Sequence, residues 1–191
     1  MGRELLIPKE QSSGDSTSDD SDLHCDFSKI TYRKFEFTDV KESRQIFLDY
    51  WSDVNSTDLH GTTEFISSGE PCTILTVDAK VLQLHEEGIS IQLAILNGQD
   101  IVGLLLHRVA FDCVLAIDGL YVYESFRKHG IGKSLIDSLE KPIKKLIFQT
   151  RILKRPHLMF GALENMKLEP KKIQFKDNKI VWECDWRSSG S

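Results

Sequence analysis

The chain has 191 residues, of which 40% are hydrophobic and 28% charged, and its formal net charge is −5. Its length and apolar content suit one domain, and it has neither an apolar N-terminal signal segment nor a run of about 20 apolar residues, so we expect no secretion and no membrane span. Its cysteines lack the spacing of a zinc site and are typical of reduced thiols in a cytosolic or nuclear protein: Cys25, Cys72, Cys113 and Cys184.

The charge is distributed unevenly along the chain. Residues 1–29 carry three basic residues against seven acidic ones and include a Ser- and Asp-rich stretch. We therefore expect an acidic, disordered tail, followed by a domain over residues 30–191. Residues 30–140 hold nine basic residues against 17 acidic, a net charge of −8, which would steer a cationic amine to the domain or form a solvated acidic face. Residues 141–191 hold 12 against five, a net charge of +7, but no nucleic-acid motif, so nucleic acid is not the expected partner.

The first half of the chain predicts a strand, a helix and a hairpin. Alternation of apolar and polar residues predicts a strand over residues 30–37, and the apolar spacing after Asp39, through Ile46, Phe47 and Tyr50, predicts a helix. Residues 52–87 contain glycines, a proline and short apolar patches, so we expect loops with one or two short helices there. Asn97-Gly98 is a strong two-residue turn signal and predicts a hairpin of strands 89–96 and 101–111.

The second half predicts a fourth strand over residues 113–122, with a bulge or a close backbone approach at Gly119. A helix follows, in which apolar residues recur at helical spacing: Ile131, Leu135, Ile136 and Leu139. A fifth strand over 144–150, a helix over 156–166 and a closing hairpin of 171–175 and 180–186 complete the order. The predicted fold class is α/β (α+β): one domain with a mixed, largely antiparallel sheet flanked by helices.

The segment Arg127-Lys-His-Gly-Ile-Gly-Lys133, between the fourth strand and its helix, is the strongest functional signal. A helix N-terminus has backbone N–H groups without intrahelical partners and carries about +0.5 charge, so it attracts an anion, which Gly130 and Gly132 would let come close. Gly132-Lys133-Ser134 also resembles the end of a nucleotide-binding P-loop, but Arg127 stands where that motif requires its first glycine. A helix that merely begins with glycines is the other alternative, although Ser, Thr, Asp and Asn are the usual N-cap residues.

Arg127-Lys-His-Gly-Ile-Gly132 matches the Gln/Arg-x-x-Gly-x-Gly/Ala signature of the GCN5-related N-acetyltransferases, and Leu120-Tyr-Val122 resembles the Leu-x-Val that precedes it. The order of the predicted elements over residues 30–186 is also similar to that of the family. The resemblance implies a sheet splayed between its fourth and fifth strands, with acetyl-coenzyme A as co-substrate and no metal. It implies that the loop binds the pyrophosphate and that the fourth strand runs beside the pantetheine, so the cofactor-binding residues would be Leu120, Tyr121, Val122, Arg127, Lys128, His129, Gly130, Ile131, Gly132 and Lys133.

The implied activity is acetyl transfer to a primary amine, on a protein lysine or N-terminus or on a small polyamine-like molecule, by direct attack on the thioester. Such an amine must first lose a proton, because its pKa is about 10.4. Ile117-Asp-Gly-Leu-Tyr-Val122 resembles the Ile-Glu-Asp-Leu-Tyr-Val of many members, so the expected base is Asp118, acting through a water; a structural carboxylate is the alternative. Tyr121 and Tyr123 would point away from Asp118 in an unbroken strand, and a bulge would change that.

The sequence departs from the family in its late helix. Members commonly place a catalytic tyrosine there, within a pattern like Phe-Tyr-Glu-Lys-x-Gly-Phe, whereas this chain has Leu163 at the tyrosine and Lys167 at the glycine. Tyr123, His157 or solvent would then protonate the thiolate, which is itself a tolerable leaving group. The alternative function is a catalytically degenerate member that acts as a coenzyme A-binding or protein-interaction module.

Residues 120–132 are also similar to the α-tubulin acetyltransferases, through an aromatic pair, a Glu-Ser and a His-Gly-x-Gly. The cysteine expected upstream in those enzymes falls on Ala116, however, and the catalytic aspartate falls on Lys154. A tubulin lysine is therefore a minor alternative among the protein acceptors.

Overall fold

The computed structural model of the protein describes residues 26–56, 74–111, 113–140, 143–151, 163–176 and 179–187. Within these ranges seven strands form one sheet in the order β1-β2-β3-β4-β5-β7-β6. Neighbouring strands pair antiparallel except β4 and β5, which pair parallel. The predicted α/β class with a mixed, largely antiparallel sheet is therefore confirmed. No helix in the described ranges is long and apolar enough to cross a membrane.

The elements follow the predicted order along the chain. The strands are β1 (Ile30–Lys34), β2 (Ser90–Leu96), β3 (Asp100–Phe111), β4 (Val114–Val122), β5 (Lys145–Arg151), β6 (Pro170–Lys176) and β7 (Lys179–Asp185). The α-helices are α1 (Val40–Ser56), α2 (Ile74–Glu86) and α3 (Ile131–Asp137). Three short 3-10 helices precede β1, α1 and α3, namely η1 (Phe27–Lys29), η2 (Phe37–Asp39) and η4 (Glu124–Phe126).

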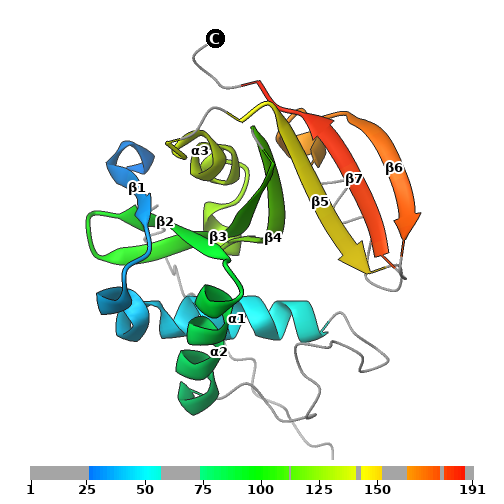
Figure 1. The fold of residues 1–191 in the computed structure, drawn as a ribbon. Coiled ribbons are helices and arrows are strands. Elements are labelled where there is room, and N and C mark those ends of the chain that lie inside the picture. Colours follow the sequence, from blue (N-terminus) through cyan, green and yellow to red (C-terminus); the bar gives the residue numbers. More distant parts are fainter. Residues whose placement is uncertain are drawn as a thin grey trace, which may run out of the picture.

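Helices cover both faces of the sheet. Figure 1 shows α3 on one side of β2, β3 and β4, and α1 and α2 on the other. Each face has its own hydrophobic cluster. The α3 cluster includes Leu115, Leu135, Leu146 and Trp182, and the α1 cluster includes Phe47, Val77, Leu93 and Leu104. The strand β4 lies between the two clusters, so its side chains reach both.

Most predicted elements are present, with differences at particular boundaries. Asn97 and Gly98 both have positive φ, 52° and 74°, and form the predicted hairpin turn between β2 and β3. The strand predicted over residues 30–37 is too long, because β1 ends at Lys34. Asp39 ends it: its carboxylate accepts from Arg33 at 2.7 and 2.6 Å and from the Glu36 N–H at 2.7 Å, which closes the chain into η2.

Two predicted segments fall largely outside the described residues. Of the predicted acidic tail over residues 1–29, the structure describes Asp26 and η1, which form an ordered turn before β1. Of the helix predicted over residues 156–166, it describes 163–166, of which 163–165 are helical, so Lys154 and His157 are outside it. In the region 52–87, where we expected short helices, α2 has 13 residues.

The sheet opens between β4 and β5. These strands pair in parallel from Val114 opposite Lys145 to Ile117 opposite Phe148, although β4 continues to Val122. Figure 1 shows β5 diverging from β4 beyond this point. The predicted splay between the fourth and fifth strands is therefore present, and it begins after Ile117.

Candidate functional site

A β-bulge lies in β4 where the sheet opens. Ile117 is opposite His107 of β3 and Gly119 is opposite Leu106, so Asp118 is an extra residue in the register. Ile117 is also where the pairing with β5 ends. The bulge and the splay therefore coincide at Asp118, and the main chain that follows it has no β5 partner.

The bulge reverses the alternation of side chains along β4. Ile117 packs in the α3 cluster, as do Leu120 and Val122 beyond the bulge, whereas Tyr121 and Tyr123 pack in the α1 cluster. In an unbroken strand Ile117 and Tyr121 would share a face. The bulge that the sequence analysis allowed in this strand is thus present, and it changes the face on which the two tyrosines lie.

Asp118 forms an ion pair with Arg108 of β3. Arg108 donates from Nε to Oδ2 at 3.0 Å and from Nη2 to Oδ1 at 2.5 Å, and these hydrogen bonds hold the pKa of Arg108 above its usual value. The Asp118 side chain is still 22% exposed, so water reaches it. Both carboxylate oxygens accept hydrogen bonds from Arg108, as expected if Asp118 has a structural role. If Asp118 acts as a base instead, one of these oxygens must also accept the incoming proton.

Tyr50 of α1 links the bulge to Tyr121 of β4 and to Tyr123, which follows the strand. Its ring centroid is 6.1 Å from that of Tyr121, which is in turn 5.6 Å from that of Tyr123. Burial raises the pKa of Tyr50, and the nearby Asp118 carboxylate raises it further. Asp118 and the three tyrosines therefore lie on the same side of the sheet.

The Tyr123 hydroxyl donates a hydrogen bond to Asp49 of α1. The distance from its oxygen to Asp49 Oδ2 is 2.8 Å, and Gln45 Nε2 donates to Oδ1 at 2.9 Å. Burial raises the pKa of Tyr123, and the bond to Asp49 adds to the effect, so the hydroxyl keeps its proton at neutral pH. Sequence reasoning missed Asp49 because it is 74 residues from Tyr123 and belongs to no motif.

The loop before α3 presents a row of backbone donors. Lys128 and Gly130 have left-handed φ values of 67° and 77°. The Ser134 N–H donates to the Gly130 carbonyl at 2.9 Å, whereas the N–H groups from Lys128 to Gly132 donate to no backbone carbonyl of the described residues. Successive N–H groups in such a turn form a concavity that suits an anion. The two glycines and Lys128 thus give the loop the geometry predicted for a phosphate.

The side chains of the loop anchor it to neighbouring elements. Arg127 donates from Nε to the Val122 carbonyl at 2.8 Å, and its guanidinium carbon is 5.8 Å from the Tyr121 ring centroid. The Lys133 ammonium is 5.9 Å from the Trp186 ring centroid. Ile131 is buried in the α3 cluster. The predicted cofactor-binding residues of the loop and of β4 therefore lie together.

Leu120 and His129 complete this group of predicted residues. A Cβ built on Gly132 would be 3.4 Å from Leu120, so the start of α3 lies directly against β4. The His129 ring stacks on Phe27 of η1, with centroids 3.8 Å apart. Phe27 was not predicted from the sequence, because it lies in the segment expected to be a tail.

Leu163, which the sequence resemblance places at the tyrosine of the late helix, is buried in the α3 cluster with 1% of its surface exposed. Its side chain has no titratable group and cannot donate a proton. Lys167, at the position of the family glycine, keeps the backbone conformation that suits glycine, with φ 55°. The departure from the family is thus chemical rather than conformational.

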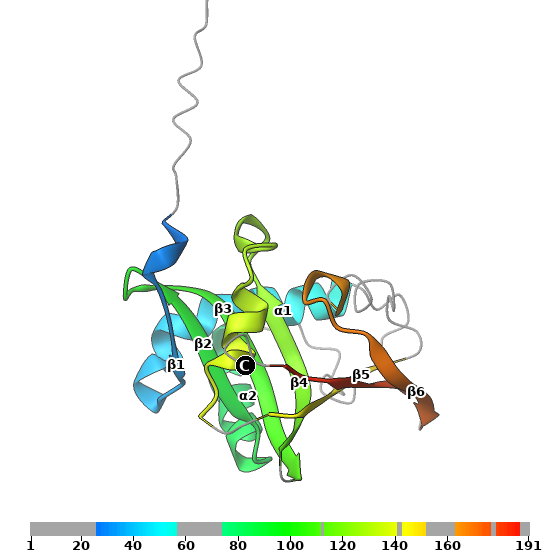
Figure 2. The ribbon, with the colours of Figure 1, turned by 90° about the horizontal axis from the view of Figure 1, so that it is seen from above.

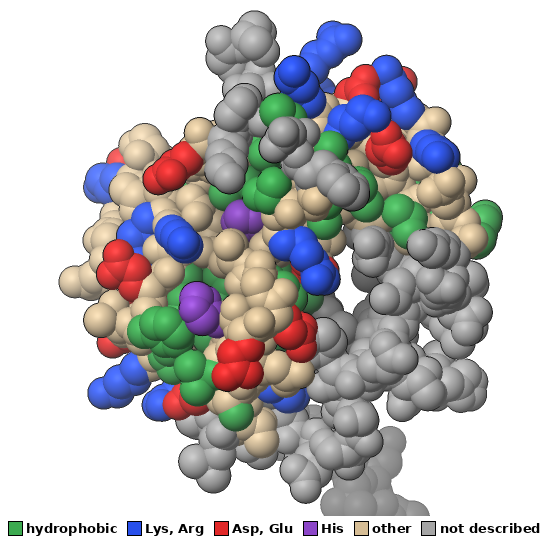
Figure 3. Space-filling view, in the orientation of Figure 1, with side chains coloured by type: hydrophobic (Ala, Val, Ile, Leu, Met, Phe, Trp, Pro, Cys, Tyr) green, Lys and Arg blue, Asp and Glu red, His purple; other side chains and the backbone are tan. Residues whose placement is uncertain are grey.

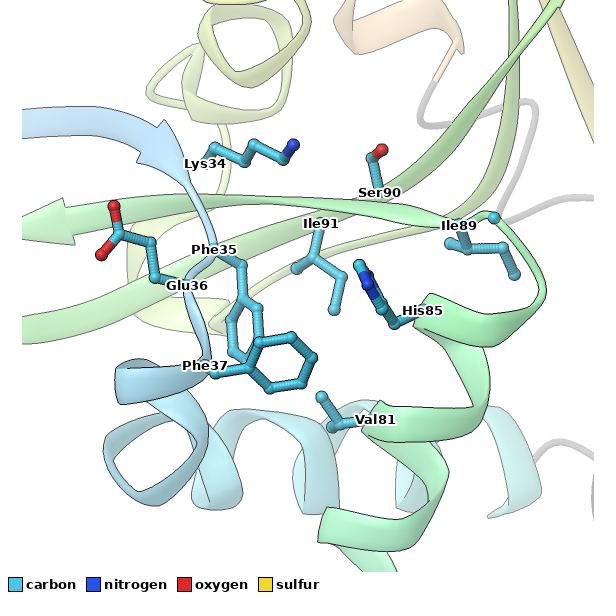
Figure 4. A pocket seen from close by; sticks show the side chains of 10 residues that line it. Lys34, Phe35, Glu36, Phe37, Val81, His85, Ile89, Ser90 and Ile91 are labelled. Atoms are coloured by element: carbon cyan, nitrogen blue, oxygen red, sulfur yellow. The ribbon is translucent and has the colours of Figure 1, made fainter.

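A separate hollow of about 280 Å³ lies where η2, the end of α2 and the start of β2 meet. Figure 4 shows Phe35, Val81 and Ile91 around it, with the rings of Phe37 and His85 facing each other. Those two ring centroids are 5.2 Å apart in an edge-to-face contact. The hollow shares no residue with the loop at 127–133. It is therefore separate from the loop predicted to bind the cofactor.

The basic C-terminal part of the chain pairs its charges on the sheet. Lys145 of β5 donates to Glu183 of β7 at 2.7 Å, and Lys171 of β6 forms an ion pair with Asp185. Figure 3 shows basic and acidic side chains side by side over this end of the molecule. The positive charge of this segment is thus partly neutralised where it is exposed.

Comparisons with known proteins agree with this architecture. A family model described as the acetyltransferase (GNAT) family matches residues 42–154, more than half of the chain. No curated protein matches the chain in sequence.

Many solved structures match the fold. The Thermoplasma acidophilum PaiA N-acetyltransferase in complex with coenzyme A is 16% identical, with a TM-score of 0.55 over 82% of this chain and 99% of that one. An acetyltransferase from Thermus thermophilus is 14% identical, with a TM-score of 0.59 over 83% and 97%. The Escherichia coli ribosomal-protein-S18-alanine N-acetyltransferase is 13% identical, with a TM-score of 0.51 over 82% and 93%. At these identities the similarity shows the fold.

Proposed function

Because the chain belongs to the GNAT acetyltransferase family, we propose that it is an acetyl-coenzyme A-dependent N-acetyltransferase that acts on a primary amine of a protein or a small molecule. The observation that carries the proposal is the loop at residues 127–133, with its row of N–H donors from Lys128 to Gly132. Apart from its two chain neighbours, a Cβ built on Gly130 would meet no atom of the described residues within 4 Å, so this side of the loop is open to a ligand. Donors of this kind fit a pyrophosphate.

The opened edge of β4 fits the remainder of the cofactor. Beyond Ile117 the main chain of Leu120 to Val122 has no β5 partner, so its polar groups can bond an extended amide chain such as pantetheine. The bound cofactor supplies an activated thioester. A main-chain N–H of this segment is then the expected donor to the oxyanion that develops on the carbonyl.

The proton transfers fall to side chains on the α1 side of β4. Asp118, at the apex of the splay, would receive the ammonium proton of the acceptor through a water, since its carboxylate is partly exposed. Tyr123 keeps its hydroxyl proton and would supply one to the departing thiolate, in place of the family tyrosine that Leu163 replaces. The acceptor would be a protein lysine or N-terminus, or a small polyamine-like molecule.

Thiol release tests this proposal. The full-length protein is incubated with acetyl-coenzyme A and a panel of amines and peptides, and free coenzyme A thiol is measured over time. Amine-dependent release is the expected result. Gly130→Glu is the matched variant, because its carboxylate would repel a pyrophosphate at a position with φ 77°. Calorimetry should show coenzyme A binding to the wild type and none to this variant; equal binding would remove the loop from the cofactor site.

The second candidate function is a coenzyme A-binding or interaction module without catalysis. One observation favours it: both oxygens of Asp118 are bonded to Arg108. The resemblance that places a leucine, Leu163, where the family has its acid agrees with it. Coenzyme A binding without thiol release for any acceptor in the panel would support this function over the enzyme.

A further inference from the structure

A second carboxylate, that of Asp49 on α1, lies on the same side of β4 as Asp118. The Tyr123 hydroxyl donates to its Oδ2 at 2.8 Å, and Gln45 Nε2 donates to its Oδ1 at 2.9 Å. Both donors are neutral, and no Lys, Arg or His among the described residues forms an ion pair with Asp49. Two hydrogen bonds thus hold this negative charge in place without neutralising it.

The two carboxylates of the site differ in their charge balance. Asp118 accepts from Arg108 at both of its oxygens, so its negative charge is already paired. Asp49 is partly exposed, and a carboxylate has more acceptor positions than its two bonds use. A cation that approaches this side of β4 therefore finds an unpaired negative charge at Asp49 and a paired one at Asp118.

Three tyrosine rings connect the two carboxylates. The Tyr50 ring lies beside the bulge, where the Asp118 carboxylate raises the pKa of its hydroxyl. Its centroid is 6.1 Å from that of Tyr121, which is 5.6 Å from that of Tyr123, the residue bonded to Asp49. Figure 2 shows α1, which carries Tyr50 and Asp49, passing across β2, β3 and β4. The space between the carboxylates is therefore lined by aromatic rings, which suit a methylene chain.

Two further observations favour a cationic ligand on this side. The guanidinium carbon of Arg127 lies 5.8 Å from the Tyr121 ring centroid, so the row of rings already attracts positive charge. Residues 30–140, which include α1 and β4, carry a net charge of −8. Such a surface steers a molecule with two positive charges more strongly than one with a single charge.

We propose that Asp49 is a specificity-determining residue that binds a second positive charge of the acceptor, so that the preferred acceptors carry two amines joined by an apolar linker. The inference rests on the proposed function, since it names the acceptor class for the same site. The reacting amine lies beside Asp118, and the second stays protonated, because its pKa is about 10.4, and donates to Asp49. The linker covers the tyrosine rings. A small diamine and a lysine next to another lysine share this chemistry.

Specificity ratios measured by thiol release test the role of Asp49. In one arm, kcat/KM for diaminobutane, diaminohexane and diaminooctane is divided by that for the monoamine of the same chain length. In the other, a peptide with two adjacent lysines is compared with the same peptide in which one lysine is glutamine. Because each ratio compares two substrates of one protein, a change in folding or in Tyr123 affects both and cancels.

The variants are D49N, which removes the charge but keeps an acceptor for Tyr123, and D49E, which keeps the charge. D100N is the matched control, because it removes one exposed carboxylate at the start of β3. In at least one arm we expect a wild-type ratio of about five- to tenfold, the effect of one partly exposed ion pair. D49N should lower it to about one, D49E should retain part of it and D100N should match the wild type.

The outcomes separate this inference from the function on which it rests. A preference in the diamine arm alone indicates a small-molecule acceptor, and one in the peptide arm alone a protein; either supports the role of Asp49 if D49N abolishes it. Wild-type ratios near one in both arms, or a preference that D49N retains, would overturn the inference and leave the proposed function standing. An equal loss in D100N would also overturn it, because net charge would then explain the effect. If the wild type releases no thiol with any amine, the proposed function fails and the inference fails with it.

Discussion

The ring of Tyr50 occupies the space in which a side chain on Gly119 would lie. A Cβ built on Gly119 would be 2.8 Å from Tyr50 Cζ and closer still to its hydroxyl oxygen. Tyr50 is held there by neighbouring rings, with centroids 6.2 Å from Trp51 and 6.1 Å from Tyr121. The absence of a side chain at position 119 thus lets α1 pack directly on the bulge beside Asp118.

Gly119→Ala should therefore destabilise the protein by about 2–3 kcal/mol, because the added methyl group overlaps the Tyr50 ring, which must shift against its neighbours to make room. Urea unfolding measures the change. Gly132→Ala is the control: its Cβ would meet Leu120 at an ordinary 3.4 Å, and in a helix it should cost nothing or stabilise by about 0.5–1 kcal/mol. Equal costs for both substitutions would show that Tyr50 does not constrain position 119.

Asp118→Asn should lower kcat by about tenfold to a hundredfold at neutral pH and leave coenzyme A affinity near that of the wild type. The amide cannot accept the ammonium proton, and the backbone donors of the loop are untouched. Arg108→Gln is the companion variant, because it frees the carboxylate from its ion pair while keeping it in the site. We expect Arg108→Gln to keep its turnover. Similar losses in both variants would assign Asp118 a structural role in the ion pair.

Tyr123→Phe should lower kcat by about tenfold, with little change in coenzyme A affinity. The reduction is modest because a thiolate leaves without full protonation. The expected cost in stability is about 1 kcal/mol, since Asp49 keeps its bond from Gln45. Tyr32→Phe on β1, a partly buried tyrosine outside the site, is the control. Wild-type turnover in Tyr123→Phe would leave solvent as the proton donor.

Local signals predicted the parts of the fold that depend on neighbouring residues. Asn97-Gly98 formed its hairpin turn because both residues accept positive φ, and the glycine at position 130 does so before α3. The spacing of apolar residues predicted α3, because Leu135 and Ile136 must both face the core. These features need no information about distant segments of the chain.

The remaining features depend on how different strands and helices contact one another. The ion pair of Arg108 and Asp118 forms because the β3–β4 register, with its bulge, brings residues ten positions apart into contact. The bond from Tyr123 to Asp49 requires α1 to pack on β4. Likewise, the strand over residues 30–37 was predicted too long because its alternation continues past the point where Asp39 binds Arg33. None of these contacts leaves a local pattern.

Lys167→Gly should stabilise the protein by about 0.5–1 kcal/mol. Leu168 N–H donates to the Leu163 carbonyl at 2.8 Å and Lys167 N–H to the Glu164 carbonyl at 2.9 Å, the pair of bonds that ends a helix at a left-handed residue. Lys167 adopts φ 55° there, where a Cβ is unfavourable. Asn165→Gly, two residues earlier and still within the helix, should instead destabilise the protein. Thermal unfolding compares the stabilities of the two variants. Destabilisation by Lys167→Gly would show that the backbone at Lys167 is not strained.

His107 should make the stability of the protein pH-dependent between pH 6.5 and about 4. Burial lowers the pKa of His107 from 6.5 to about 4; Asp118 opposes the shift and Lys34 adds to it. Its Nδ1 has no hydrogen-bond partner among the described residues, so a proton there would be buried without compensation.

As the pH falls below 6.5, the unfolded chain binds a proton on this imidazole that the folded chain does not, so the free energy of unfolding decreases. The loss attributable to His107 is on the order of 3 kcal/mol by pH 4. Urea unfolding of wild type and His107→Gln across this range measures it. Carboxylates also weaken the fold in acid; for example, hydrogen bonds from Arg33 lower the pKa of Asp39. Both proteins therefore lose stability as the pH falls, and the difference between their slopes reports on His107. Parallel slopes would show that the imidazole is protonated in the folded protein as readily as in the unfolded chain.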